Sequence, residues 1–182
     1  MSHRIEASPA YSTEDSKVMG NISMMWHRIV MINDVDFGPI DAVWIAPEGA
    51  QLLLLTRERT LYWDVREDRA LWSIREKAGG DGISPDGRIY RDLSSGLFYP
   101  VLGPHGGRQL HTHPIGGRID VHDAVVVTAP DGTTHSLSHE GCSNDGSFGN
   151  WRIVTFCESG DHILIAGPRC LVVYAIPSRQ ST

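Results

Sequence analysis

The stretch that decides the fold runs from Asp41 to Ile74 and reads DAVWIAPEGAQLLLLTRERTLYWDVREDRALWSI. It holds four short segments rich in branched and aromatic residues, at 42–45, 52–55, 60–65 and 70–74. Only a few polar or turn-forming residues separate one segment from the next. Segments of this length and composition, with tight turns between them, predict strands joined as an antiparallel meander. The four leucines at 52–55 predict a strand that is buried on both faces.

A second stretch repeats this pattern 111 residues further along the chain. A shift of 111 without gaps places Val43 on Val154, Leu52 on Ile163 and Leu61 on Val172. Three units of about 37 residues would fill the interval, and turns at 84–87 and 122–123 lie close to the expected thirds. A four-stranded unit of about this length is typical of a propeller blade. The sequence therefore predicts an all-β fold of about four antiparallel, four-stranded blades.

The segment at 42–65 resembles a WD40 repeat. It joins an apolar first strand, a PEG turn, the run LLLL, and TLYWDV with the dipeptide Trp63-Asp64. The turn SPDG at 84–87 matches the turn of this family, and LVVYAI at 171–176 is similar to its third strand. This resemblance, strong at 41–74 and 151–176, implies a β-propeller that presents its loops and faces to protein partners. The Gly-His pair that opens a WD40 unit is absent, so the buried hydrogen-bond network of the family is not carried over.

The last unit lacks a sequence for its fourth strand after LVVYAI. The segment Arg28–Ile32, upstream of the first unit, has the length and composition to supply that strand. Pairing it there would protect an otherwise open edge. The strand could close the unit within its own chain or join the blade of a second chain. We favour the second arrangement, a dimer that completes a larger ring, because WD40 rings usually hold more than four blades and symmetric pairs are the commonest oligomers.

Composition indicates one globular domain. Of 182 residues, 41% are hydrophobic and 21% are charged, close to the averages for folded domains. Residues 1–20 are polar and are predicted to form a flexible N-terminal arm, and residues 21–182 are predicted to form a single domain. The net charge of −6 and the lack of a Lys/Arg stripe argue against nucleic acid as a partner.

The remaining compositional signals concern the membrane and the compartment. No apolar stretch approaches the ~20 residues that a membrane-spanning helix needs. Three cysteines without a C-x-x-C pair argue against a disulfide framework. We therefore expect reduced thiols and a cytoplasmic location.

The motif HTHP at 111–114 is a candidate metal site. An H-x-H pair on a strand places both imidazoles on one face, which suits Zn²⁺. The motif also resembles the JAB/MPN metalloproteases, which implies zinc ligands at His111 and His113 and an aspartate at position 124. Position 124 is alanine, Asp123 comes one place early, and Val121 stands where that family has serine. A zinc-dependent hydrolase using His111, His113 and Asp123 is therefore kept as an alternative.

These observations predict a non-catalytic module for protein binding and assembly that forms homo-oligomers and needs no cofactor. The chain has no G-x-S-x-G motif and no phosphate-binding glycine motif. A carbohydrate-binding propeller is a further alternative. The long polar loop at 103–113 and the turn at 57–59 are the predicted partner-binding surfaces, through His105, Arg108, His111, His113, Arg57 and Arg59.

Overall fold

The structure, a computed structural model, describes residues 26–139 and 150–176, and the predicted N-terminal arm lies outside these ranges. Apart from a one-turn helix α1 (Asp34–Phe37) and a 3-10 turn η1 (Gly80–Gly82), the described elements are strands, which confirms the all-β prediction. The strands are β1 (His27–Asn33), β2 (Ile40–Ile45), β3 (Gln51–Thr56), β4 (Thr60–Asp64), β5 (Arg69–Ile74), β6 (Ile89–Arg91), β7 (Phe98–Pro100), β8 (Arg118–Val121), β9 (Val125–Thr128), β10 (Thr134–Leu137), β11 (Ile153–Phe156), β12 (His162–Ala166) and β13 (Cys170–Ala175).

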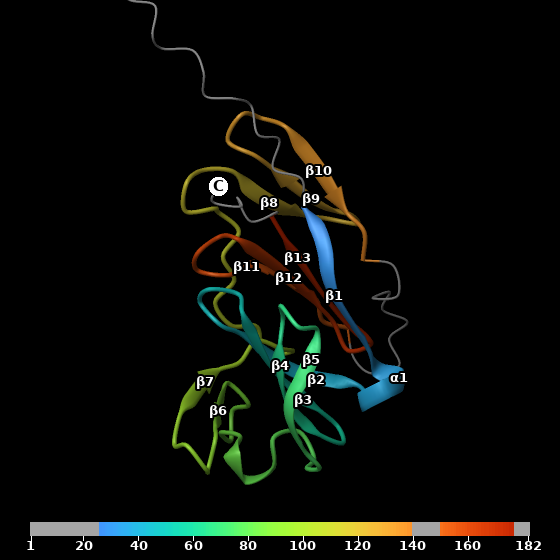
Figure 1. The fold of residues 1–182 in the computed structure, drawn as a ribbon, viewed down its shortest axis with the longest axis vertical. Coiled ribbons are helices and arrows are strands. Elements are labelled where there is room, and N and C mark those ends of the chain that lie inside the picture. Colours follow the sequence, from blue (N-terminus) through green and yellow to red (C-terminus); the bar gives the residue numbers. More distant parts are fainter. Residues whose placement is uncertain (1–25, 140–149, 177–182) are drawn as a thin grey trace, which may run out of the picture.

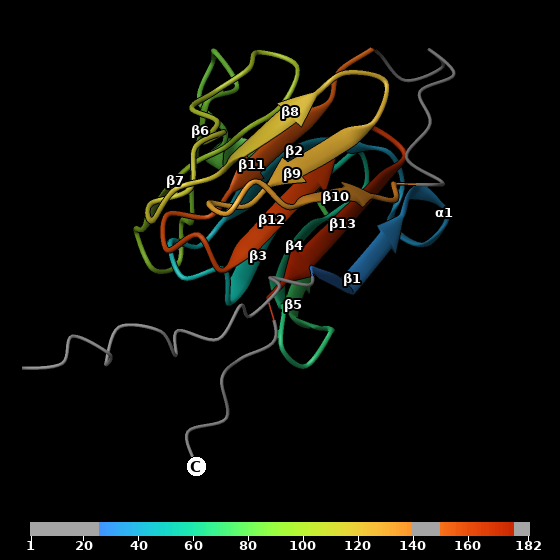
Figure 2. The ribbon, with the colours of Figure 1, turned by 90° about the horizontal axis from the view of Figure 1, so that it is seen from above.

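These strands form four antiparallel sheets. Sheet I has the order β2-β3-β4-β5, sheet II is the hairpin β6-β7, sheet III has the order β8-β9-β10, and sheet IV has the order β11-β12-β13-β1. Figure 1 shows them stacked along the long axis of the molecule, with sheet III at the top, then sheets IV and I, and sheet II at the bottom. Figure 2 looks down this axis from the sheet III end.

Sheet I is the meander that the sequence predicts. Leu54 pairs with Val43 on one side and with Leu61 on the other, so the three inner strands are in register. All four leucines of β3 are at most 1% exposed. This burial on both faces follows from the stack, because sheet I lies between sheets IV and II.

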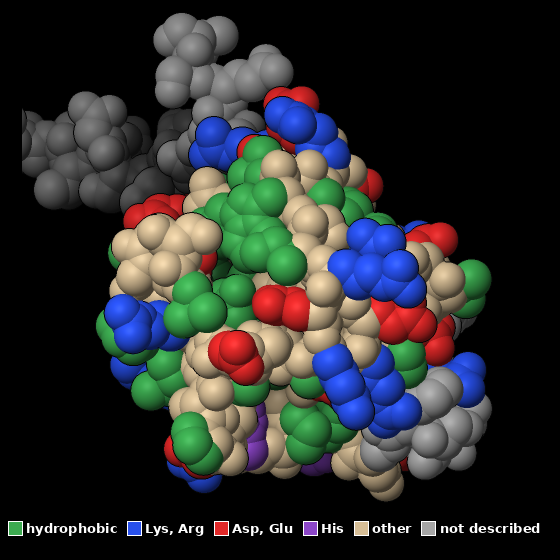
Figure 3. All heavy atoms as spheres, turned by 90° about the horizontal axis from the view of Figure 1, so that it is seen from below, with side chains coloured by type: hydrophobic (Ala, Val, Ile, Leu, Met, Phe, Trp, Pro, Cys, Tyr) green, Lys and Arg blue, Asp and Glu red, His purple; other side chains and the backbone are tan. Residues whose placement is uncertain are grey.

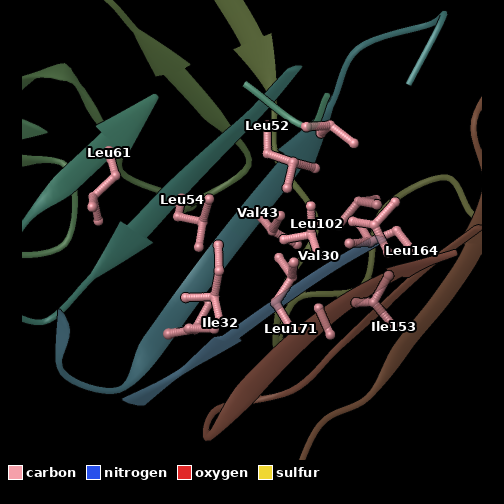
Figure 4. Packing of buried hydrophobic residues seen from close by; sticks show 14 residues of the cluster. Val30, Ile32, Val43, Leu52, Leu54, Leu61, Leu102, Ile153, Leu164 and Leu171 are labelled. Carbon is pink, nitrogen blue, oxygen red and sulfur yellow. The ribbon is translucent and has the colours of Figure 1, made fainter. Parts of the chain in front are cut away.

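Three hydrophobic clusters join the sheets in the order III–IV–I–II. Between sheets IV and I, Val43 and Leu52 pack with Val30 and Leu171, as Figure 4 shows from close by. Between sheets III and IV, Val127 of β9 packs with Val154, Ile163 and Val172, which lie on the opposite face of β11, β12 and β13. The third cluster joins sheets I and II, and includes Leu53, Leu55, Tyr90 and Tyr99.

The 111-residue repeat is visible in how sheets I and IV are oriented. Val43 and Leu52 of sheet I face sheet IV, whereas their counterparts Val154 and Ile163 face sheet III. Equivalent side chains therefore point the same way along the stack. Because the two sheets stack head to tail, the stack has two unlike end faces.

The N-terminal strand completes sheet IV, as predicted. β1 pairs antiparallel with β13, with Met31 opposite Val172 and Ile32 opposite Leu171. The pairing is seen within the single chain that the structure contains, so the dimer in which this strand joins a second chain stays a prediction. Val30 and Ile32 are 1% and 3% exposed and belong to the core cluster between sheets IV and I.

The two middle units differ from four-stranded blades. Sheet II has two strands and sheet III has three, and over the described residues the four sheets form an open stack instead of a closed ring. The chain leaves sheet II soon after β7. Val101 still donates to the carbonyl of Arg88 at 2.8 Å, but Leu102 exchanges two hydrogen bonds with Val43 of β2, at 2.8 and 2.7 Å. Residues that would extend sheet II instead cover the edge of sheet I.

The cysteines differ from the expectation of three reduced thiols. Cys157 is a free thiol and is 2% exposed, whereas Cys170 is disulfide-bonded. Disulfides persist mainly in oxidising compartments, so the bond at Cys170 counts against the expected cytoplasmic location. Within the described ranges, no helix is both long and apolar enough to cross a bilayer.

A histidine fills the contact between the β2–β3 turn of sheet I and the start of β12 in sheet IV. The ring of His162, the first residue of β12, lies against Gly49 in the β2–β3 turn. Burial lowers the pKa of His162 below its ordinary 6.5, an effect that nearby Asp161 opposes and Arg66 reinforces. The folded protein therefore favours the neutral imidazole.

This lowered pKa predicts a loss of stability in mild acid. Below about pH 6.5 the unfolded chain binds a proton at His162 that the folded chain resists, so stability should fall as pH decreases towards the lower, folded pKa. Urea unfolding at pH 7 and pH 5.5 would measure the loss. His162→Gln should reduce the difference between the two pH values. An unchanged difference in this variant would assign the effect to other groups.

Candidate functional site

The predicted recognition loop is a crossing segment that runs from the edge of sheet I to the edge of sheet IV. It begins after Leu102, which pairs with Val43 of β2, and makes a tight turn in which Gly103 and Gly106 exchange backbone hydrogen bonds. It reaches β11 at Leu110. β2 and β11 are the edge strands of their sheets, so the segment covers two open edges.

The second half of this segment is held against β11 by four contacts. The N–H of Leu110 donates to Thr155 Oγ1 at 2.8 Å, and the N–H of Phe156 donates to the carbonyl of Leu110 at 2.9 Å. The N–H of Val154 donates to Gln109 Oε1 at 3.0 Å, and His111 Nε2 lies 2.9 Å from the Val154 carbonyl oxygen. The side chains of Gln109 and His111 thus bind the backbone N–H and carbonyl of Val154, in place of a neighbouring strand along this edge of β11. His111, predicted to contact a partner, makes this contact within the chain and stays exposed.

A cleft of about 370 Å³ opens between this segment, sheet II and the ends of β2 and β11. Its walls are mainly apolar and its rim carries charge. Arg88 and Arg108 are the cations, and Glu158 is the acid. The apolar lining is Trp44, Ile45, Ile89, Pro100, Val101, Leu102, Leu110 and Phe156. Such a hollow, apolar with a few polar groups, has the general character of a small-molecule site.

His105 lines a second cleft, of about 390 Å³, on the other side of the crossing segment. Both of its ring nitrogens are shielded and have no hydrogen-bond partner within the described part of the chain. Asp41 lines the same cleft, and burial raises its pKa against the opposing charges of Arg57 and Lys77. His105 and Arg108 therefore line different clefts, although they are only three residues apart in the loop.

The three residues of the alternative zinc site differ in their surroundings. His113 is 7% exposed, and its ring packs edge-on against Phe156 with centroids 5.2 Å apart. His111 is exposed and contacts β11, and Asp123 is exposed in the turn between β8 and β9. Within the described ranges, no group of three or more His, Cys, Asp or Glu side chains is arranged to hold a metal ion.

The two arginines of the predicted second surface lie at the β3–β4 turn. Arg57 is exposed, and its Nε is 3.9 Å from Asp41 Oδ1. Arg59 is half-buried, and its Nη1 donates to Ser73 Oγ at 3.3 Å. Both side chains have partners within sheet I and its neighbouring loops, and neither lines the cleft that contains Arg108.

The outer face of sheet II is an apolar surface that the sequence analysis missed. Tyr90 and Tyr99 face sheet I, so the alternating residues Ile89 and Phe98 point away from the stack, and they are 43% and 66% exposed. Figure 3 views the molecule from this end and shows apolar side chains interrupted by charged ones. We call this surface the apolar end; it comprises Ile89, Leu93, Leu97, Phe98 and Pro100. A sequence signal existed, because Leu97-Phe98 beside Tyr99 leaves a large apolar residue on each face of a two-stranded hairpin.

The apolar end and the cleft are continuous, since Ile89 and Pro100 belong to both. Of the predicted site residues, only Arg108 lines this combined region. Comparison with protein-family models and with curated protein sequences finds no match for this chain, so the resemblance to WD40 repeats stays a prediction.

Proposed function

We propose that the protein is a non-catalytic binding and assembly module, a minimal propeller-like stack that forms a two-fold dimer through the apolar end. The observation that supports this proposal most is the exposure of Leu93, Leu97 and Phe98, at 64%, 58% and 66%, on one small hairpin. Single exposed apolar residues are ordinary, but several on one face mark an interaction site. Aromatic residues at the centre of such a face contribute most to binding.

The unlike ends of the stack favour a symmetric contact over a repeating one. The other end, the outer face of sheet III, is polar, and its Arg118 Nε lies 3.0 Å from Asp120 Oδ2. Thr128, Thr134 and Ser136 lie on the same face, with the half-buried Val126 as the apolar residue among them, and Ile119 and Val127 lie on the inner face. A head-to-tail contact would bury this ion pair against Phe98, and desolvating charges is costly. Two apolar ends facing each other avoid that cost and close the assembly at two copies.

The arginine beside Phe98 is compatible with this contact. The guanidinium of Arg91 lies over the Phe98 ring, 5.6 Å from its centroid. Its alkyl stem can cover apolar surface while the charged group stays in water at the rim. A stable dimer of this kind buries about 1,200–2,000 Å² in total, with charge kept to the edge of the interface.

Phe98→Glu should convert the dimer to a monomer. A carboxylate at the centre of the contact should weaken dimerisation by about 2 kcal/mol or more, which is about thirtyfold in Kd. Sedimentation equilibrium across a concentration series measures this directly. Val35→Glu is the matched control, because Val35 in α1 is an equally apolar residue, 89% exposed, far from sheet II in the sequence. A wild-type protein that stays monomeric at high micromolar concentration would reject the dimer, and equal effects of both variants would reject this interface.

A further inference from the structure

The cleft beside the apolar end combines an aromatic and aliphatic interior with an excess of positive charge. Trp44 contributes aromatic surface from sheet I, and Leu110 contributes aliphatic surface from the crossing segment. Arg88 and Arg108 stand at the rim, against the single carboxylate of Glu158. This local excess is notable because the chain as a whole carries a net charge of −6.

Neither arginine is committed to a strong ion pair. Arg108 is exposed and has no carboxylate within salt-bridge distance among the described residues. Arg88 lies 4.0 Å from Asp86, and both side chains are more than 60% exposed, so this pair contributes little. Both guanidinium groups are therefore available to an anionic ligand, which a planar fork of donors can bind in a bidentate manner.

Hydrogen bonds within the chain hold the walls of the cleft in place. The hydrogen bonds from Leu110 to Thr155 and from Phe156 to Leu110 hold the crossing segment on β11. The backbone pair of Val43 and Leu102 holds its other end on β2. A ligand would therefore not have to order the segment first, which lowers the cost of binding.

We propose that this cleft binds a small ligand in which a flat apolar body carries a carboxylate, the body lying against Trp44 and Leu110 and the carboxylate facing Arg108. The volume of about 370 Å³ suits a ligand of this size. The site adjoins the proposed dimer contact at Ile89 and Pro100, but the central residue of that contact, Phe98, does not line the cleft.

Titration calorimetry with 2-naphthaleneacetate, and with the neutral 2-naphthaleneacetamide, tests the proposal. We expect the acid to bind in the submillimolar range and the amide about tenfold more weakly, because only the acid offers a charge-assisted hydrogen bond. Arg108→Met should weaken the acid by about tenfold and leave the amide unchanged. Arg69→Met is the matched control, because Arg69 is equally exposed but lies on β5, away from the cleft, and it should change neither affinity.

Amide chemical shifts locate the site independently of affinity. The acid should shift the signals of Gly107, Leu110 and Glu158 but not that of Gly132, which lies in the β9–β10 turn. Phe98→Glu should bind the acid as tightly as the wild type does, so loss of the dimer and loss of the site can be told apart. Equal affinity for acid and amide, an Arg108→Met variant that binds normally, or shifts outside the cleft would each overturn the proposal.

Discussion

Val30→Asp is expected to leave the chain without a stable fold. Val30 is 1% exposed and lies opposite Val173 in the pairing of β1 with β13. Its side chain packs among apolar residues in the cluster between sheets IV and I. A buried carboxylate without a partner costs about 3–5 kcal/mol, and the lost apolar contacts add to this. A domain of this size is stable by only about 5–15 kcal/mol, so most of the margin disappears.

Met31→Asp is the control for this experiment. Met31 is the next residue of the same strand, pairs with Val172, and is 37% exposed because alternation turns its side chain outward. The two variants make the same chemical change one position apart, so strand propensity and overall charge are matched. Urea unfolding followed by circular dichroism should show a loss of at most about 1 kcal/mol for Met31→Asp, as for other surface changes. Two variants of equal stability would mean that β1 does not occupy this place.

The same strand separates two routes to a dimer. If β1 were exchanged between chains, the Phe98→Glu variant would remain a dimer, because strand exchange does not involve sheet II. If β1 pairs within its own chain, as in the structure, Phe98→Glu should be a folded monomer. Sedimentation of this single variant therefore decides between a shared sheet and an end-to-end contact.

Local pattern was enough to predict sheet I, the related strands of sheet IV and the strand that completes it. In each case a few consecutive residues are enough to show that the segment forms a strand and which of its side chains are buried. The leucines of β3 show burial on both faces, and the gapless match of Leu52 with Ile163 places equivalent strands in both sheets. The strand 28–32 was found because the last unit lacked one, and the structure pairs it with β13.

The middle units and the cleft depend on contacts that local pattern does not contain. Nothing near Leu102 indicates that it will pair with Val43, about sixty positions earlier, instead of extending sheet II. The donors of the loop at 103–113 suggested recognition, yet Gln109 and His111 hold the loop to β11. Alternation showed that Phe98 and Tyr99 face opposite ways, but which face the rest of the molecule covers is a property of the whole stack.

Gly49→Ala is expected to be the most destabilising single-methyl change in the turns of sheet I. Gly49 has a φ of +72° in the β2–β3 turn, a conformation that costs an L-residue roughly 1–2 kcal/mol. A Cβ added there would also lie 2.8 Å from Cβ of His162 and nearer still to the ring. The base of a side chain cannot swing aside as a flexible tip can, so the contact between sheets I and IV must open. We expect a total loss of about 3 kcal/mol, as for overpacked cores.

Gly87→Ala isolates the backbone part of this cost. Gly87 has a φ of +71°, yet a Cβ added there would meet nothing within 4 Å, so only the conformational term remains. Its loss of stability should be roughly 1 kcal/mol. The difference between the two variants in urea unfolding is then the cost of pushing His162 away.

Gly160 tests whether the same contact recurs at the next sheet boundary. It lies 111 residues after Gly49, has a φ of +84°, and a Cβ there would stand 2.5 Å from His113 Nε2 and 2.8 Å from Pro114 Cδ. Gly160→Ala should therefore cost as much stability as Gly49→Ala.

The double variant Gly49→Ala/His162→Ala tests the coupling between the glycine and the histidine. Part of the stability lost in Gly49→Ala should be recovered, because the ring atoms are gone and the two changes are coupled. If the losses of stability in the two single variants simply add in the double variant, then Gly49 is required for its backbone conformation alone. The histidines that cover these two turns would then not hold the sheets in their stacking order.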